Sequence, residues 1–286
     1  MVLVVGGDDP QQREGVYRSS VIVTSYNGVR RGSESSNLSY TDASIEFEAC
    51  TSRNHDFLAA YFDIQWPAMK IGEFQNMAMG CDMVNWRICF LQALMRFLLV
   101  GGADHKRQGT NDNSIFPQTK HLAAASTSVT QYLQDSLDPN HFYGNVEKFH
   151  PSVYARTDPA CTSTSVRRGT IRMMKRNKQL GREYLHYRSG HKDASRAEEY
   201  DDTEAVDTLP GMKVLNGSLD IYGPCFLPSL RSLCPNARNP IFSNFSVALF
   251  GSALPRGPRN DPKLTGLMEL LLASMLMDYE SWKKHI

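Results

Sequence analysis

The stretch from residue 83 to residue 100 is the most apolar part of the chain, and it constrains the fold more than any other segment. Its apolar side chains surround most of a helix's circumference, so such a helix must be covered on nearly every side. Two arginines within it would be costly in lipid, which favours a buried helix over a membrane-spanning one. Asp82 suits an N-cap, and Gly101 with Gly102 suits a stop. The sequence predicts a helix over 82–100 in the middle of a core or at an oligomer interface.

The N-terminal part carries strand-type patterns. Residues 15–28 are rich in β-branched and aromatic side chains and end in an Asn-Gly pair, which is typical of hairpin turns. Residues 44–50 alternate apolar and polar side chains, as a half-buried strand does. Residues 57–66 fit a strand or a helix, because periodicity does not separate the two, and Pro67 is expected to end either element.

Further elements are expected along the rest of the chain. Residues 120–137 fit a mildly amphipathic helix, and 218–227 and 241–251 resemble short strands between loops. Asp261 and Pro262 suit the N-cap and first position of a last helix that reaches almost to the end. This C-terminal helix is nearly all apolar, so its own domain or a second subunit must cover it. We therefore expect a homo-oligomer formed through the C-terminal helix.

These elements together predict an α+β fold with a β-rich N-terminal portion, a central buried helix and a helical C-terminus. At 286 residues the chain is long enough for one large domain or two ordinary ones. Residues 138–165 are loop-like and contain three prolines, which suggests a boundary between a β-then-α portion, 1–137, and a charged and mixed portion, 138–286. The same prolines also fit a loop within a single domain.

The charge is distributed unevenly along the chain. The net charge is +1, which implies no general attraction to nucleic acid or anionic lipid. Residues 166–192 nevertheless contain nine Lys and Arg against one Glu, a charge of +8, so the rest of the chain carries −7. Acidic residues cluster directly after this stretch, up to Asp207. Any electrostatic argument is therefore local to 166–207.

Seven basic residues of this stretch are candidate contacts for nucleic acid. They are Arg167, Arg168, Arg172, Lys175, Arg176, Lys178 and Arg182. If 170–180 is helical, cations at three-and-four spacing share one face, and scattered apolar residues leave no stripe to bury. Tyr184, Tyr187 and Arg188 follow, and arginines with interleaved aromatics suit phosphate contacts plus base stacking. The pattern predicts an exposed segment or one that a partner orders.

Other interpretations of the charged stretch stay open. Runs of charge are usually solvated loops with no further task. The acidic residues can also fold back on the basic ones and restrain binding until a ligand displaces them. They can equally pair with the basic run of a neighbouring subunit.

A catalytic alternative lies in the polar loop 101–112, directly after the central helix. Asp104 and His105 can serve as a base and its orienting group, and the glycines allow close backbone approach. The spacing matches no nucleophile motif, and G-x-S-x-G occurs nowhere in the chain. This loop supports the hypothesis of a hydrolase or transferase.

The sequence predicts no metal site and no cofactor. No pair of Cys or His residues has the usual zinc spacing, and H-E-x-x-H is absent. The six cysteines are expected to be reduced and mostly buried. The N-terminal apolar run is too short for a signal peptide, and no stretch fits a membrane span. These features predict a cytoplasmic or otherwise intracellular protein.

Missing catalytic motifs, one local basic block and an apolar C-terminal helix favour an assembly role over an enzyme. In general plan they resemble a nucleocapsid or coat component, and the resemblance is one of plan only. The sequence therefore predicts a self-associating structural protein that binds RNA or another single-stranded nucleic acid through the basic residues. A third hypothesis is a protein–protein interaction module that uses the C-terminal helix and involves neither catalysis nor nucleic acid.

Overall fold

The structure is a computed structural model of the chain. It describes residues 10–35, 38, 43–52, 55–68, 73–81, 88–99, 115–116, 130–131, 133–135, 162–189, 205–225, 227–233, 244 and 262–277. The elements, in chain order, are α1 (Pro10–Gly28), α2 (Gly32–Ser35), β1 (Ala43–Ser52), β2 (His55–Ala68), β3 (Glu73–Met79), α3 (Phe90–Leu99), α6 (Ser163–Arg176), α7 (Arg182–Ser189), the 3₁₀-helix η6 (Ala205–Thr208), α8 (Leu209–Leu215), α9 (Leu230–Leu233) and α11 (Pro262–Met277). The described fold is thus broadly α+β, mostly helical with one small sheet.

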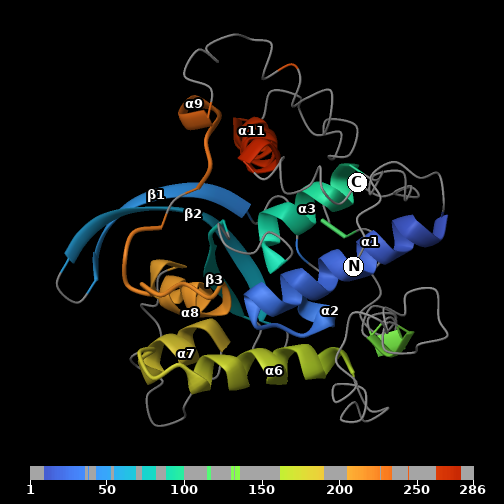
Figure 1. The fold of residues 1–286 in the computed structure, drawn as a ribbon, viewed down its shortest axis with the longest axis horizontal. Coiled ribbons are helices and arrows are strands. Elements are labelled where there is room, and N and C mark those ends of the chain that lie inside the picture. Colours follow the sequence, from blue (N-terminus) through green and yellow to red (C-terminus); the bar gives the residue numbers. More distant parts are fainter. Residues whose placement is uncertain are drawn as a thin grey trace.

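The sheet has three antiparallel strands in the order β1-β2-β3, with the long β2 in the centre. Figure 1 shows it curving between α11 on one side and α8 on the other. The alternation at 44–50 correctly predicted a strand, and 57–66 is a strand as well. Pro67 does not end β2, because it lies opposite Phe74 of β3 and the pairing continues to Ala68.

The main core is built around α3, as the apolar stretch predicted. All residues from Phe90 to Leu98 are buried, and α3 packs against both α1 and α11 (Figure 1). Its polar Gln92 is accommodated, because Gln92 Nε2 donates to Ser274 O and Oγ of α11 at 2.6 and 2.9 Å. The described helix begins at Phe90, and the predicted cap, Asp82, lies outside the described residues.

The N-terminal portion is less β-rich than predicted, because residues 15–28 belong to the helix α1. Hydroxyl groups inside it donate to carbonyls one turn back, as Thr24 Oγ1 does to Ser20 O at 2.7 Å and Ser25 Oγ to Val21 O at 2.8 Å. These bonds satisfy polar groups within the helix, so α1 can be buried against α3 and α6. Burial therefore overrides the strand preference of the β-branched residues.

The Asn-Gly pair ends a helix and forms no hairpin turn. Val29 has a φ of 52°, and the Arg30 N–H donates back to Ser25 O at 2.9 Å, a left-handed helix ending that usually carries glycine. Gly28 lies against Trp66 of β2, since a Cβ there would come within 2.6 Å of the indole ring. The prediction of a hairpin turn was therefore wrong: the Asn-Gly pair marks the end of an element, and that element is a helix.

Residues 218–225 and 227 contain turns and no strand, contrary to the prediction for 218–227. Lys213 of α8 explains this conformation, because its Nζ donates to Asp220 O at 3.2 Å and to Gly223 O at 2.5 Å. These carbonyls are satisfied by an ammonium group and need no neighbouring strand. Gly217, with a φ of 75°, provides the left-handed ending of α8 from which this turn starts.

The remaining predicted elements are described only in part. The C-terminal helix starts at Pro262, as predicted, and is described up to Met277. Within 120–137 the five described residues are helical. Of 241–251 only Asn244 is described. The division of the chain after residue 137 stays a prediction.

Candidate nucleic-acid interface

The predicted binding segment folds into two helices, α6 and α7, joined by a tight turn. At the start of α6 the Thr162 N–H donates to Ser165 Oγ at 3.0 Å, a capping contact. At its end Asn177 leaves helical geometry, and its Oδ1 accepts a hydrogen bond from the Gln179 N–H at 2.9 Å. This turn ends α6 at Arg176, five residues before Gly181.

One side of α6 is buried, although its apolar residues appeared scattered in the sequence. Arg167, Thr170 and Met174 are buried, and Ile171 packs against the same cluster as Met174. Their spacing of three and four is that of one helix face, which lies against α1, α7 and α8. Two of these four residues are polar, so an apolar stripe was not visible. The rest of the chain, and not a partner, therefore orders α6.

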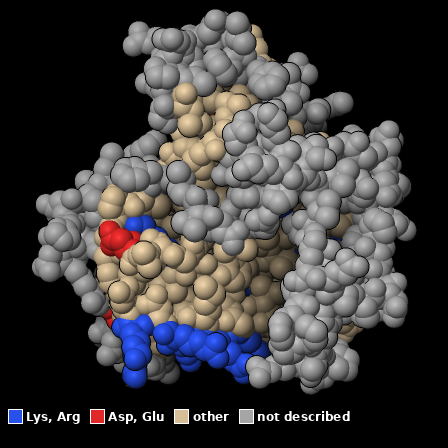
Figure 2. All heavy atoms as spheres, viewed as in Figure 1, with Lys and Arg blue, Asp and Glu red and all other residues tan. Residues whose placement is uncertain are grey.

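The opposite side of the two helices is basic. Six of the seven predicted contact residues are exposed: Arg168, Arg172, Lys175, Arg176, Lys178 and Arg182. Figure 2 shows blue side chains gathered along the lower edge of the molecule, where α6 and α7 lie in Figure 1. Within the described part of the chain, no acidic side chain forms an ion pair with any of the six. These six residues are called the basic face below.

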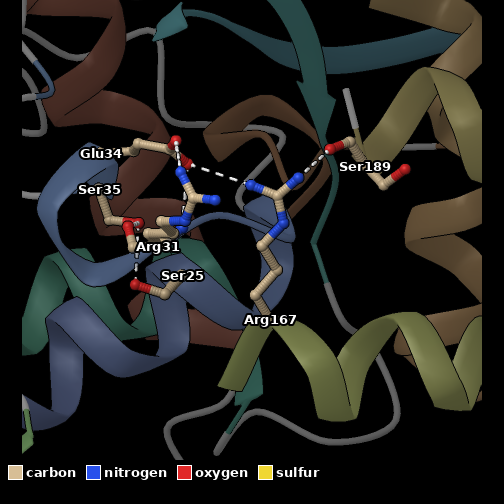
Figure 3. A network of polar contacts seen from close by, with 6 residues as sticks. All are labelled: Ser25, Arg31, Glu34, Ser35, Arg167 and Ser189. Atoms are coloured by element: carbon tan, nitrogen blue, oxygen red, sulfur yellow. Dashed lines mark hydrogen bonds and ion pairs between the residues drawn. The ribbon is translucent and has the colours of Figure 1, made fainter. Parts of the chain in front are cut away.

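Arg167, the seventh predicted contact, points into the protein (Figure 3). Its Nη2 donates to Ser189 O of α7 at 2.8 Å, and its Nη1 lies 3.6 Å from Glu34 of α2. Glu34 also pairs with Arg31 at 3.6 Å and accepts the Arg31 N–H at 3.0 Å. Burial lowers the pKa of Arg167, and the charge of Glu34 raises it in part. Arg167 joins α6 to α2 and α7 and is not part of the basic face.

Arg188, which the sequence placed among the binding residues, is fully buried. Its Nε and Nη2 donate to Asn27 O at 3.0 and 2.6 Å, and its Nη1 donates to Ala78 O at 2.8 Å and to Thr208 O at 3.0 Å. Burial, and next the charge of Arg30, lower its pKa to about 9. That value keeps the guanidinium charged at neutral pH. One side chain thereby connects α7 with α1, β3 and η6.

The tyrosines of α7 take part in an aromatic cluster. The ring of Tyr184 lies 6.0 Å from that of Tyr187 and 5.6 Å from that of Tyr222, edge to face in both pairs. Tyr222 Oη donates to Gln179 O at 2.9 Å and accepts the Gly181 N–H at 3.3 Å. This cluster fixes the α6–α7 turn. Tyr222 was not predicted to contribute, because no local sequence signal connects it with a turn 41 residues earlier.

The other predicted sites have different outcomes. Asp104 and His105, with the rest of loop 101–112, lie outside the described residues. Among the residues that the structure does describe, no group of three His, Cys, Asp or Glu could hold a metal ion. Cys81, Cys89 and Cys225 are buried free thiols.

The apolar C-terminal helix is covered within its own chain. Its residues Leu267, Met268 and those from Leu270 to Ser274 are buried, and it packs against α3, α9 and β1. Self-association through this helix stays a prediction. No helix in the described part of the chain is long and apolar enough to cross a membrane.

Comparisons with known proteins add no identification: no protein-family model, no curated protein and no solved structure matches the chain. The functional argument therefore depends on the residues of the site alone.

Proposed function

We propose that this protein binds single-stranded nucleic acid, RNA in the first place, through the basic face. The observation that carries the proposal is the two-sided construction of α6 and α7. Their inner side is held in the protein by Arg167 and Arg188, and their outer side presents six exposed cations. Such a local basic surface is the footprint expected of a protein that contacts phosphates.

The geometry of the face suits a strand of phosphates. Arg168, Arg172 and Arg176 follow each other at intervals of four residues, so their side chains leave one side of α6 over about 12 Å of helix axis. Lys178 in the turn and Arg182 at the start of α7 add two further cations beyond α6. Met173, 40 % exposed, adds apolar surface beside these charges, which suits contact with unstacked bases.

A rigid face has an energetic advantage over a disordered basic segment. The backbone of α6 is already ordered by its buried side, so binding does not require the conformational entropy of folding a segment. The remaining entropic cost of binding is the ordering of the long Arg and Lys side chains of the basic face. We expect the association to be mainly electrostatic and to tolerate many sequences.

The test measures binding of a single-stranded RNA by fluorescence anisotropy at several salt concentrations. We expect the affinity to fall with salt, and replacing Arg168, Arg172 and Arg176 by Gln to lower the slope of log K against log salt by about 2, from ~0.7 per phosphate contact. The matched control replaces the same three residues by Lys, which keeps the charges and should keep the slope. Salt-insensitive binding, or equal slopes for the Gln and Lys variants, would contradict the proposal.

The role that we propose is structural, in line with the nucleocapsid- or coat-like plan expected from the sequence. Light scattering on the purified protein, with and without RNA, tests whether copies assemble on a strand. We expect assembly to require the strand, because the described residues of α11 are mostly covered within one chain. A stable oligomer that forms without RNA and is abolished by changes in α11 would contradict that dependence.

A further inference from the structure

A pocket of about 460 Å³ opens at the corner where α6 turns into α7, beside the basic face. The size lies within the range of small-molecule sites, roughly 300–1,000 Å³. The residues that matter for its chemistry are the apolar Leu180 and Leu185, the amide of Asn177, and the cations Lys175 and Arg182. Both cations are exposed members of the basic face.

The apolar part of the pocket is firmly positioned. Met174 and Leu185 are buried in one cluster, and Leu180 packs against it. The turn that carries Leu180 is fixed by the hydrogen bonds of Tyr222 to Gln179 and Gly181. Met174 is fully buried and supports the pocket from within, so the side chains of Leu180 and Leu185 form the apolar surface that accepts a flat ring. The pocket thus offers a preformed place for a ring system and needs no rearrangement of the turn.

Asn177 provides a directed polar group in the same pocket. Its Oδ1 accepts the Gln179 N–H at 2.9 Å, and this bond fixes which end of the amide is oxygen. The Nδ2 group is therefore the free end of a held side chain and can donate to a ring nitrogen or carbonyl. A donor of this kind, next to an apolar floor, is how proteins recognise the edge of an unstacked base.

We propose that this pocket receives one nucleotide, with the base against Leu180 and Leu185 and the phosphate at Lys175 and Arg182. The apolar floor accounts for the base, the amide for its edge, and the two cations for the charge. The nucleotide is either one residue of a bound strand or a free mononucleotide. The first source rests on the proposed function, and the second does not.

The test compares single strands of about ten nucleotides that carry bases with abasic strands of the same length. We expect the wild-type protein to prefer the base-carrying strand by roughly ten-fold or more, since stacking one base contributes on that scale. Asn177→Asp keeps the Oδ1 acceptor, removes the amide donor and adds a negative charge. It should bring the affinity for the base-carrying strand down to that for the abasic strand.

The matched control is Gln179→Glu, which adds the same charge two residues away at an exposed side chain outside the pocket lining. We expect it to weaken binding of both strands by the same factor and to leave the preference for bases intact. Leu180→Ala is the second variant, and it should reduce the preference without changing the slope against salt. Thermal unfolding of each variant verifies that the fold is kept.

A titration with a nucleoside monophosphate and with ribose phosphate separates the two sources. Saturable binding of the nucleoside monophosphate but not of ribose phosphate supports the pocket, even if no strand binds, provided that Asn177→Asp abolishes this binding. Salt-dependent strand binding without any preference for bases, together with no mononucleotide binding, overturns the pocket and leaves the proposed function standing. Equal effects of Asn177→Asp and Gln179→Glu on that preference also overturn it.

Discussion

The inner and outer sides of the α6–α7 pair use the same residue types for opposite purposes. On the inner side, Arg167 and Arg188 are buried. Arg167 donates to a carbonyl oxygen of α7 and forms an ion pair with Glu34 of α2, and Arg188 donates to carbonyl oxygens of α1, β3 and η6. On the outer side, six cations are exposed and form no ion pair within the described residues. A count of positive charge along the sequence therefore adds together residues that hold the fold and residues that are free to bind a ligand.

The difference also shows how a charge can be buried without a carboxylate partner. Arg188 donates mainly to main-chain carbonyls, which carry partial negative charge and are themselves in need of donors. The guanidinium and three carbonyls satisfy each other. Removing the guanidinium leaves the buried carbonyls without donors. We therefore expect substitutions on the inner side of the helix pair to lower the stability strongly, and substitutions on the outer side to change it little.

The largest effect is expected from Arg188→Met. The carbonyls of Asn27, Ala78 and Thr208 then lose a donor in a buried place, which should lower the free energy of unfolding by roughly 3–5 kcal/mol. Arg182→Met makes the same change on the outer side and should stay within about 0.5 kcal/mol. Urea denaturation followed by circular dichroism measures both. Similar losses for the two variants would remove the distinction between the sides.

A smaller effect is expected from Arg167→Met, which removes the bond to Ser189 O and the contact with Glu34. We expect a loss of about 2 kcal/mol, the scale of a hydrogen bond to a charged group. Glu34→Gln should cost a similar amount, because Arg31 and Arg167 then face each other without their shared carboxylate. In a double-mutant cycle the two losses should not add. Strict additivity would show that this ion pair does not contribute.

Two helical glycines test the same comparison without a change of charge. Gly211 of α8 faces the inner side, where a Cβ would come within 2.8 Å of Met174 Cε and 3.0 Å of Arg188 Cδ. Gly211→Ala should therefore destabilise the protein by about 1 kcal/mol, since the flexible Met174 can move in part. Gly169 of α6 has nothing within 4 Å of its added Cβ. Gly169→Ala should stabilise by roughly 0.5–1 kcal/mol, as measured by thermal unfolding.

The smallest effect on stability is expected from the outer charges themselves. Replacing Arg168, Arg172 and Arg176 by Gln should change the free energy of unfolding by less than about 0.5 kcal/mol, because these side chains are exposed. A small increase in stability would agree equally well with an exposed outer face, since three like charges repel each other along one side of a helix. A loss comparable to that of Arg167→Met would mean that the outer side also holds the fold.

Several elements could be predicted from the sequence because their signals are local. The continuous apolar run gave the buried α3, the alternation at 44–50 gave β1, and Pro262 marked the start of α11. Residues 15–28 were wrongly predicted as a strand because the strand preference of β-branched residues is weaker than the free energy gained by burial. The hydroxyl groups of α1 find their carbonyl acceptors only once the helix has formed, so these hydrogen bonds could not be predicted from the sequence. The strand expected at 218–227 failed because Lys213 satisfies the carbonyls of that turn.

The candidate site was predicted in part for the same reason. Helical spacing placed Arg172, Lys175 and Arg176 on one face, and all three are exposed. The burial of Arg167 and Arg188 could not be predicted, since their partners are distant in the chain. A search for a mixed face of polar and apolar residues at positions i, i+3 and i+7 of the expected helix would have found Arg167, Thr170 and Met174. The pocket could not be predicted either, because its turn is held by Tyr222, which lies 41 residues away from Gly181 in the chain.

The contacts of Arg188 have a consequence for how the protein folds during synthesis. The carbonyls that it reaches lie 161 and 110 residues before it and 20 residues after it. Because synthesis runs from the N-terminus, α7 emerges from the ribosome before the last of its acceptors, Thr208, does. Contacts between such distant parts of a chain form late in folding. We expect the nascent chain to present a firmly docked basic surface only after Thr208 has emerged, so under the proposed function the surface becomes complete late in synthesis.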